Sequence, residues 1–321
     1  MIVITLIVLA AARLSRREQQ QSLDRQLSTQ AFYAAESGVN DASKAIESDL
    51  ASGGTLLDAD YTTDCQEFIS PAVAALNPDL GASVKYSCLL VDPTPTTWEG
   101  NASETSRIIP IQDKNGLPVT SVEISWQDKD GRSNFGCPLT FPAATSWGCE
   151  TPILRFDIVP TTVANRNALN ASQMTGFLIP SSAGATVSNI SYAASGGVAV
   201  PLKQTVTCNL GNSPKFCRAR ITGLIGTKHS LRIKSIYGSS AVTVSGHNVS
   251  GDKIELVGAQ VVIDSTGKAN DILRRIQVRR SLSGEINLPE FAIESSNNIC
   301  KQLEVNGSGT TTSVNPECPL N

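Results

Sequence analysis

The feature that most constrains this fold is an unbroken helical pattern over the first fifty residues. Residues 1–50 contain no proline, and Gly38 is the only glycine before the pair Gly53 and Gly54. An apolar side chain recurs every three or four residues, so these side chains share one helix face. The stripe consists of Leu23, Leu27, Ala31, Ala35, Val39, Ala42, Ile46 and Leu50. One helix of about 75 Å is therefore predicted, ending at the glycine pair.

The helix begins with an apolar tip, "MIVITLIVLAAA", which ends at Arg13. The tip has twelve apolar residues, whereas a membrane-spanning helix needs about 20, so the tip as it stands is too short to span a bilayer. A secretory signal carries its basic residues before the apolar run, whereas Arg13, Arg16 and Arg17 follow it. The pattern fits a peripheral anchor, a coiled coil or the core of a helical filament. A coiled coil is the least favoured, because no Leu/Ile heptads are sustained.

Eight cysteines indicate disulfides, because their number is even and no C-x-x-C spacing occurs. Disulfides would mean an oxidising compartment and an exported protein; the alternative is eight reduced thiols in a cytosolic protein. Sequence alone does not choose among the connectivities. We expect pairing between consecutive cysteines: Cys65 with Cys88, Cys137 with Cys149, Cys208 with Cys217, and Cys300 with Cys318.

The composition limits the functions that the chain could have. The net charge is −3 and aromatic residues make up 5% of the 321 residues, so nothing points to nucleic acid, and a core must be built from aliphatic side chains. The only histidines are His229 and His247, and we expect each at the end of a strand. No catalytic triad, carboxylate pair or phosphate-binding loop is evident. We expect no enzyme activity, no cofactor and no metal site.

Beyond the helix, the pattern changes to short alternating strands separated by turn signals. Residues 118–127 and 153–159 alternate apolar and polar side chains, and residues 229–238 and 240–246 flank a Gly/Ser turn that indicates a hairpin. We predict an α+β fold in which the long N-terminal helix precedes a disulfide-stapled, mainly antiparallel β region. The predicted divisions are a helix (1–50), a linker with short helices and loops (51–105), a β-rich head (106–290) and a C-terminal segment pinned by a disulfide (291–321).

Two further groups of side chains have competing interpretations. Four arginines in residues 274–280 could form a basic patch for polyanions. Strand alternation would divide each adjacent pair between two faces, so we favour a solvated strand. Trp98, Trp126 and Trp147 could form a sugar-binding platform, but packing in the core or under loops is the better interpretation.

Residues 13–42, "RLSRREQQQSLDRQLSTQAFYAAESGVNDA", resemble the N-terminal helix of type IV pilins and pseudopilins, and most closely the PilX-type segment. The similar run consists of Ala31, Phe32, Ala34, Ala35, Glu36 and Gly38. The resemblance covers roughly residues 1–48. Pilins carry a basic leader and a Glu at the fifth mature position, whereas this chain has Thr5 and no acidic residue before Glu18. Either the chain begins inside the apolar helix or the family's Glu is absent; we expect the first, because about ten more apolar residues would restore a full span.

The resemblance implies a structural subunit of a type IV pilus, held in the inner membrane before assembly. The subunit would polymerise with copies of itself and with other pilins, through separate assembly machinery, into extracellular filaments for motility, adhesion or DNA uptake. A host-cell or surface receptor is a further partner that the resemblance allows. The implied filament-core side chains are Ile2, Ile4, Leu6, Leu9, Leu14, Leu23, Leu27, Phe32, Ala35 and Val39. Charge pairs between subunits would involve Arg13, Arg16, Arg17, Glu18, Asp24 and Arg25.

Other functions stay open. A membrane-tethered adhesion protein would use the helix only as a tether, and a minor tip pilin would not form the filament body. A secretion pseudopilin usually has a smaller head, and an exported enzyme is the most distant alternative. The alanine-rich stripe in residues 27–46 favours assembly, because it suits close helix packing better than solvent.

Overall fold

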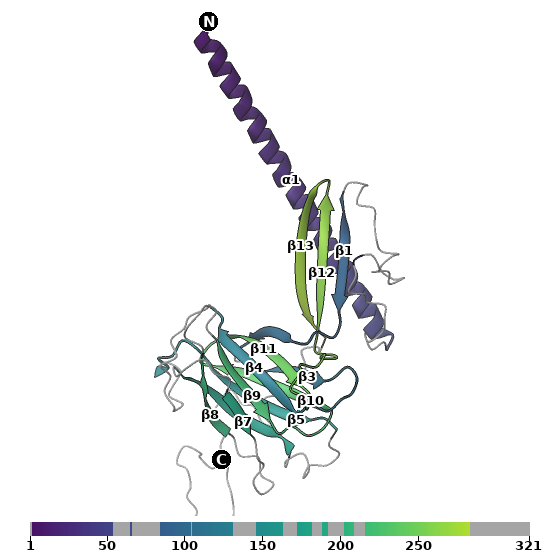
Figure 1. The fold of residues 1–321 in the computed structure, drawn as a ribbon, viewed down its shortest axis with the longest axis vertical. Helices are drawn as coiled ribbons and strands as arrows, with labels where there is room; N and C mark the ends of the chain where they lie inside the picture. Colours follow the sequence, from purple (N-terminus) through teal and green to yellow (C-terminus); the bar gives the residue numbers. More distant parts are fainter. Residues whose placement is uncertain are drawn as a thin grey trace, which may run out of the picture. The chain divides into compact units, whose positions relative to one another are not determined.

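The computed structural model describes residues 2–53, 65, 84–103, 105–130, 146–162, 172–181, 188–191, 202–208 and 216–282. Within these ranges the chain forms one long helix and three β-sheets (Figure 1). Helix α1 (Ile2–Ala51) ends just before Gly53, whose φ is 84°. The end predicted at the glycine pair is therefore correct, and the α+β class is confirmed. The chain divides into two units, residues 1–285 and 286–321; the second, with the predicted segment 291–321, lies outside the described residues.

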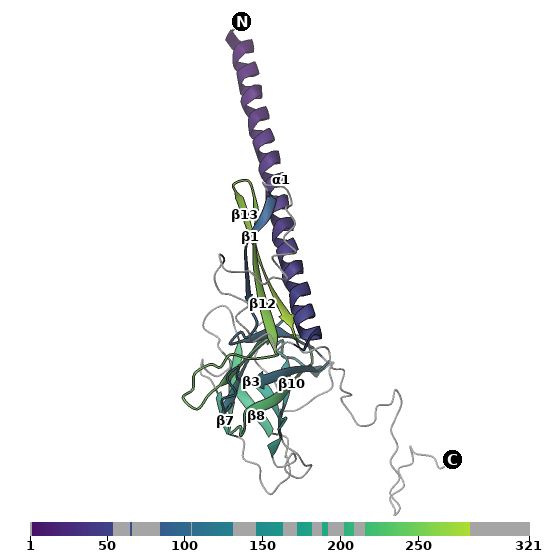
Figure 2. The same cartoon turned by 90° about the vertical axis from the view of Figure 1, so that its right-hand side faces the viewer.

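A three-stranded antiparallel sheet packs against the C-terminal half of α1. Its order is β1 (Val84–Asp92), β12 (Gln260–Ala269) and β13 (Ile272–Ser281). Figures 1 and 2 both show these strands beside the helix. The core between helix and sheet consists of Val39, Ala42, Ala45, Ile46, Tyr86, Leu89, Val91, Val261 and Ile263.

The helix approaches this sheet so closely that a Cβ atom has no room at Gly267 and would displace a side chain at Gly38. A Cβ atom on Gly267 in β12 would lie 2.0 Å from the Ala31 carbonyl oxygen, which belongs to the helix backbone. A Cβ atom on Gly38 in α1 would lie 2.4 Å from Ser265 Oγ. Small side chains on both surfaces therefore allow main chain to pack against main chain.

Two five-stranded sheets enclose a second core. One sheet has the order β3 (Arg107–Gln112), β10 (Lys228–Ile236), β5 (Ile153–Pro160), β6 (Met174–Ser181) and β8 (Leu202–Thr207). The other, here called sheet B, has the order β2 (Trp98–Ala102), β11 (Ser240–His247), β4 (Ser121–Asp128), β9 (Cys217–Thr222) and β7 (Ser188–Ser191). Pairing is antiparallel except for β6 with β8 and β7 with β9. Side chains of both sheets share one apolar cluster.

The alternation read from the sequence identifies the inward faces correctly. In β4, Val122, Ile124 and Trp126 are buried, and in β5 the side chains of Leu154, Phe156 and Ile158 are buried. This follows from the two-residue period of a strand with one face on the core.

The predicted hairpin between residues 229–238 and 240–246 is wrong. Strand β10 pairs with β3 and β5, whereas β11 pairs with β2 and β4, so the two strands belong to different sheets. At the crossing, Tyr237 has φ 69° and Gly238 has φ 150°, and the Ser235 and Ser240 hydroxyls are 3.0 Å apart. The Gly/Ser turn therefore carries the chain from one sheet to the other instead of folding it back.

The predicted divisions also need correction. Strands β1 and β2 lie within residues 51–105, expected to be a linker, because β1 pairs with β12 and β2 pairs with β11. Strands β12 and β13 lie within the predicted head but cover α1. Residues 54–64 and 66–83 of the predicted linker lie outside the described residues, and so do any short helices expected there.

Disulfides join Cys65 to Cys88 and Cys208 to Cys217. Both bridges connect consecutive cysteines, which is the pairing expected from the sequence. Cys149 is also disulfide-bonded, to a partner outside the described residues. Cys137, Cys300 and Cys318 lie outside the described residues as well. The bridges indicate that the protein resides in an oxidising compartment.

The close contact between α1 and β12 predicts a large effect for Gly267→Ala. The added methyl group meets helix backbone, which cannot move as a side-chain tip can, so unfolding should cost about 1–3 kcal/mol less. Gly148→Ala is the control, because nothing lies within 4 Å of its Cβ position. Urea unfolding of both variants measures the difference, and equal stabilities would contradict the close contact.

Candidate assembly surface on the N-terminal helix

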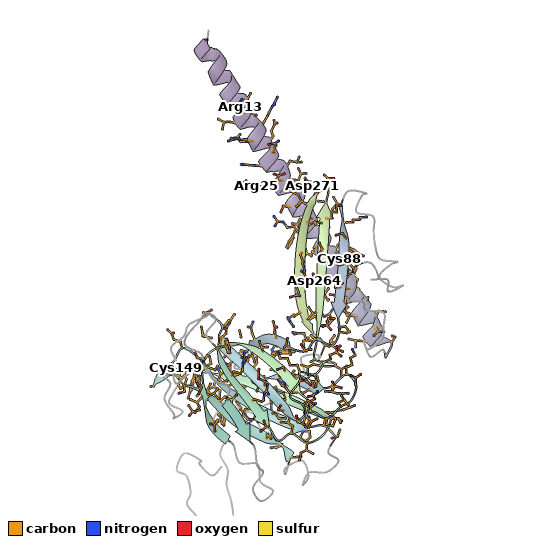
Figure 3. The ribbon with its side chains drawn as sticks, viewed as in Figure 1. Arg13, Arg25, Cys88, Cys149, Asp264 and Asp271 are labelled. Atoms are coloured by element: carbon orange, nitrogen blue, oxygen red, sulfur yellow. A yellow bond between two sulfur atoms is a disulfide. The ribbon has the colours of Figure 1, made fainter. Side chains whose placement is uncertain are left out.

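Helix α1 has a covered half and a bare half. Residues 31, 34, 35, 38, 39, 42, 45 and 46 are buried, mainly against β1, β12 and β13, whereas every residue from 11 to 26 is exposed. Figure 3 labels Arg13 on the part of α1 that extends beyond the strands, and Arg25 level with Asp271 at the turn between β12 and β13. The bare half therefore presents its whole circumference for contact.

Large apolar side chains remain exposed along α1. Ile4, Leu14, Leu23, Phe32 and Tyr33 have 64%, 60%, 53%, 49% and 62% of their surface accessible. Phe32 and Tyr33 also contact each other edge to face, with ring centroids 6.0 Å apart. Large apolar side chains gathered on one element are typical of an interaction surface.

The structure divides the predicted filament-core residues into three groups. Ile4, Leu14, Leu23 and Phe32 are exposed, and Leu27 is half-buried. Ala35 and Val39 are instead buried against the chain's own sheet. Ile2, Leu6 and Leu9 belong to α1, but their side chains lie outside the described part.

The burial of Ala35 and its neighbours changes the interpretation of the alanine-rich stripe in residues 27–46. The alanine-rich stripe was expected to favour contacts between helices of different subunits. Ala31, Ala35 and Ala42 are completely buried within the monomer, because β12 approaches the helix at Gly267. The stripe therefore explains the packing of α1 on its own sheet and gives no support to assembly.

The charged residues of the bare half have no ionic partners within the described part of the chain. All six are exposed and make no ion pair with another described side chain: Arg13, Arg16, Arg17, Glu18, Asp24 and Arg25. Because these charges pay no desolvation penalty in the monomer, they are available to pair with another chain.

The four arginines of β13, by contrast, are used within the chain. Arg274 Nε donates to Ser28 Oγ at 2.8 Å, and Arg280 pairs with Glu47, so both hold the strand to α1. Arg275 pairs with Asp264, and Arg279 Nη2 lies 3.0 Å from Glu99 Oε1. Alternation does divide adjacent arginines between the two faces, as expected, and every one has an internal partner. A small hollow of about 480 Å³ remains beside Arg274, Phe32 and Tyr33.

A polar cluster is buried where α1 meets β1 and β12. Asp41 and Ser265 are buried, and Tyr86 is only 9% exposed. Burial raises the pKa of Asp41, and Lys44 and Tyr86 oppose this shift. Burial and the adjacent Asp41 raise the pKa of Tyr86 to about 12. Asp41 and Tyr86 are thus close enough to interact, yet Asp41 Oδ2, Tyr86 Oη and Ser265 Oγ have no partner of good hydrogen-bond geometry among the described atoms.

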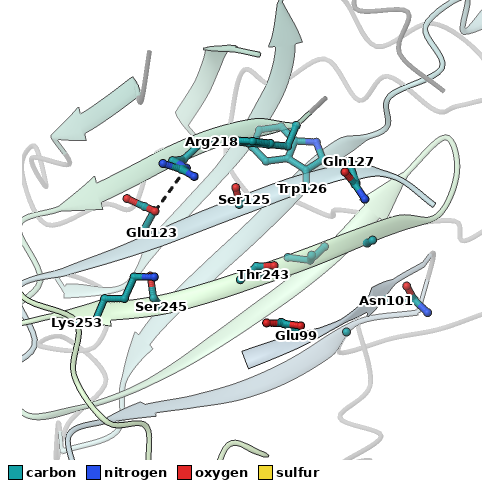
Figure 4. Close-up of a pocket in the computed structure, with 14 residues that line it drawn as sticks. Glu99, Asn101, Glu123, Ser125, Trp126, Gln127, Arg218, Thr243, Ser245 and Lys253 are labelled. Carbon is teal, nitrogen blue, oxygen red and sulfur yellow. Dashed lines mark ion pairs between the residues drawn. The ribbon is translucent and has the colours of Figure 1, made fainter. Parts of the chain in front are cut away.

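A second surface feature is a groove of about 600 Å³ on the outward face of sheet B. Its floor contains short side chains, including Thr243 and Ser125, which face each other across β11 and β4. Longer side chains form the edges, with Glu99 on β2 and Arg218 on β9 (Figure 4). Arg218 Nε lies 3.6 Å from Glu123 Oε1, and its guanidinium lies 4.8 Å from the centre of the Phe216 ring.

The remaining candidate residues have structural roles. His229 and His247 lie at strand ends, as expected, and their ring nitrogens contact the Ile225 and Gly251 carbonyl oxygens at 3.2 and 2.9 Å. Trp98 and Trp126 are buried core residues rather than a platform.

Trp147 stacks on Tyr237, with ring centroids 4.7 Å apart. Among the described residues, no three His, Cys, Asp or Glu side chains gather in a metal-binding arrangement. Across the described ranges, no helix combines the length and the apolar character needed to cross a membrane.

Comparison with known proteins found no match to this chain among family models, curated proteins or solved structures.

Sequence reasoning predicted α1 and its end correctly but missed what covers the helix. The covering strands β12 and β13 lie more than 200 residues away along the chain. One available signal was Gly267 within a strand pattern, because an isolated glycine in a strand often marks close approach of another backbone.

The buried cluster predicts that Asp41→Asn stabilises the protein at neutral pH. The folded chain holds the Asp41 proton more tightly than the unfolded chain does, since burial raises the pKa above its ordinary value of 3.8. As the pH rises through the pKa that Asp41 has in the folded chain, the ionised carboxylate therefore lowers the free energy of unfolding. Below pH 3.8 the carboxyl group is protonated in both the folded and the unfolded chain, and this loss of stability disappears.

Urea unfolding across pH measures this effect, with the exposed Glu36→Gln as the control that should change little. The stability gain of Asp41→Asn should be present at pH 7 and disappear in acid. An equal loss of stability at every pH would show instead that the fold requires the Asp41 carboxylate.

Proposed function

We propose that this protein is the structural subunit of a type IV pilus-like filament and polymerises through α1. One observation carries the proposal: the strands of the same chain cover α1 from about residue 31, while residues 11–26 are bare. A helix held firmly at one end and bare at the other suits insertion among neighbouring helices.

The exposed side chains supply the driving force for assembly. Burying apolar surface contributes about 25 cal/mol per Å², and Leu14 and Leu23 on the bare half are more than half exposed. Contacts between different surfaces of identical subunits do not close and so generate a helical polymer. The sequence resemblance of residues 1–48 to pilin helices agrees with this role.

The filament would be extracellular, and the disulfides agree with assembly outside the reducing cytosol. In this proposal the apolar tip holds the subunit at the inner membrane before assembly. The partners are further copies of this chain, other pilins and the assembly machinery.

A surface-binding protein or minor tip pilin is the second candidate. The groove on sheet B favours it, because Thr243, Ser125 and Arg218 offer hydrogen-bonding groups in a concave surface. In that case α1 would act as a tether and the bare half would not be buried by other copies.

The test is electron microscopy of filaments sheared from the source cells, with mass spectrometry of their subunits. The proposal expects this chain to be the dominant species in thin filaments. If the chain occurs in the membrane fraction and is absent from filaments, the tethered binding protein becomes the better account.

A matched set of substitutions tests the role of the bare half. Leu14→Asp combined with Leu23→Asp should lower filament yield at least about tenfold, because two charges would enter a buried contact. The fold should stay intact, since both side chains are exposed in the monomer.

The control is Ile225→Asp combined with Val249→Asp, which changes side chains that are 84% and 87% exposed and do not belong to α1. This control should leave filament yield unchanged. Equal yields from both double variants would show that the bare half of α1 does not drive assembly.

A further inference from the structure

Two stripes of side chains on α1 have the same spacing and complementary chemistry. The first, here called the leading stripe, consists of Arg13, Arg16, Gln20 and Asp24. The second, the trailing stripe, consists of Tyr33, Glu36, Asn40 and Lys44. Each member of the trailing stripe lies twenty positions after its counterpart, so one shift brings all four pairs together.

The two stripes occupy nearly opposite faces of the helix. At 100° per residue their mean directions differ by about 160°. The leading stripe continues the face that carries Ala31 and Ala35, which the sheet covers only farther along α1. The trailing stripe lies on the side away from the sheet, and all four of its side chains are exposed.

Every pair formed by this shift is favourable. Arg16 would meet Glu36, and Asp24 would meet Lys44, which gives two opposite-charge pairs. Arg13 would lie at Tyr33, where a guanidinium can stack on an aromatic ring. Gln20 would lie at Asn40, where two side-chain amides can exchange hydrogen bonds.

We propose that a second copy of this chain lays its leading stripe on the trailing stripe of the first. The two helices run parallel and are displaced by twenty residues, or about 30 Å along the axis. This inference rests on the proposed assembly through α1 and specifies its register. Because the two stripes lie on opposite faces, each copy binds one neighbour with each face, and the contact continues indefinitely.

Other arrangements of the same helices are less favourable. A shift of 23 residues would also bring Arg13 to Glu36, but it would place Asp24 against Glu47, which already pairs with Arg280. An antiparallel arrangement of the stripes would place Arg13 against Lys44. Like charges in contact oppose both alternatives.

Charge reversal tests this register in the full chain. Arg16→Glu and Glu36→Arg should each lower filament yield by about tenfold or more, because each sets like charges against each other. The double variant Arg16→Glu with Glu36→Arg should recover most of the yield, since every copy then carries the exchanged pair. Both residues are exposed in the monomer, and circular dichroism of each variant checks that it folds.

The matched control is Arg13→Glu with Glu36→Arg. A displacement of twenty residues does not bring these two positions together, so this double variant should stay defective. Its recovery, or the failure of the Arg16 and Glu36 exchange to recover, would overturn the register.

A photo-crosslinker provides a readout that does not depend on yield. With p-benzoylphenylalanine in place of Tyr33, crosslinks should map to the segment around Arg13 of another copy. Crosslinks confined to other segments would overturn the register while leaving assembly through α1 in place. If the unmodified chain forms no filaments, the proposed function itself fails.

Discussion

The whole arrangement depends on main-chain contact between α1 and β12. Gly267 allows the strand to reach the Ala31 carbonyl, and Gly38 allows the helix to reach Ser265. Because no side chain separates the two backbones at Gly267, the helix lies close enough to the sheet for Ile46, Leu89 and the other apolar groups of this core to be buried together. The same contact holds one half of α1 and leaves the other half bare.

Covering one half of the helix changes what each part can do. From residue 31 onward the apolar face of α1 packs against the chain's own sheet. The opposite face carries Tyr33, Glu36 and Lys44, which are exposed to solvent. Across residues 11–26 every side chain is exposed and no strand covers the helix. In the proposed assembly, one helix therefore provides two surfaces for neighbouring copies. One surface is the bare segment 11–26, and the other is the outward face from residue 31 onward.

Local features of the fold followed from the sequence, and distant pairings did not. The end of α1 could be predicted because a glycine at the helix terminus acts locally, and the inward faces of β4 and β5 followed from their two-residue period. The strands that cover α1 could not be predicted, since β12 and β13 are distant from it in the chain.

The strands flanking Tyr237 and Gly238 were wrongly predicted to form a hairpin, because turn-forming residues do not determine whether the chain returns to the same sheet. The alanine stripe was assigned to contacts between chains because its covering sheet was unknown, and the division of α1 into a covered and a bare half was not predicted.

Hydrogen–deuterium exchange of the protein before and after assembly tests the central claim most directly. Exchange reports local opening, so residues 31–46 should be protected in both states, because the sheet packs against them in the monomer. Residues 11–26 should exchange readily in the monomer and become protected in the assembled form. Protection of residues 11–26 that does not change on assembly would contradict the claim that this half of α1 is the assembly surface.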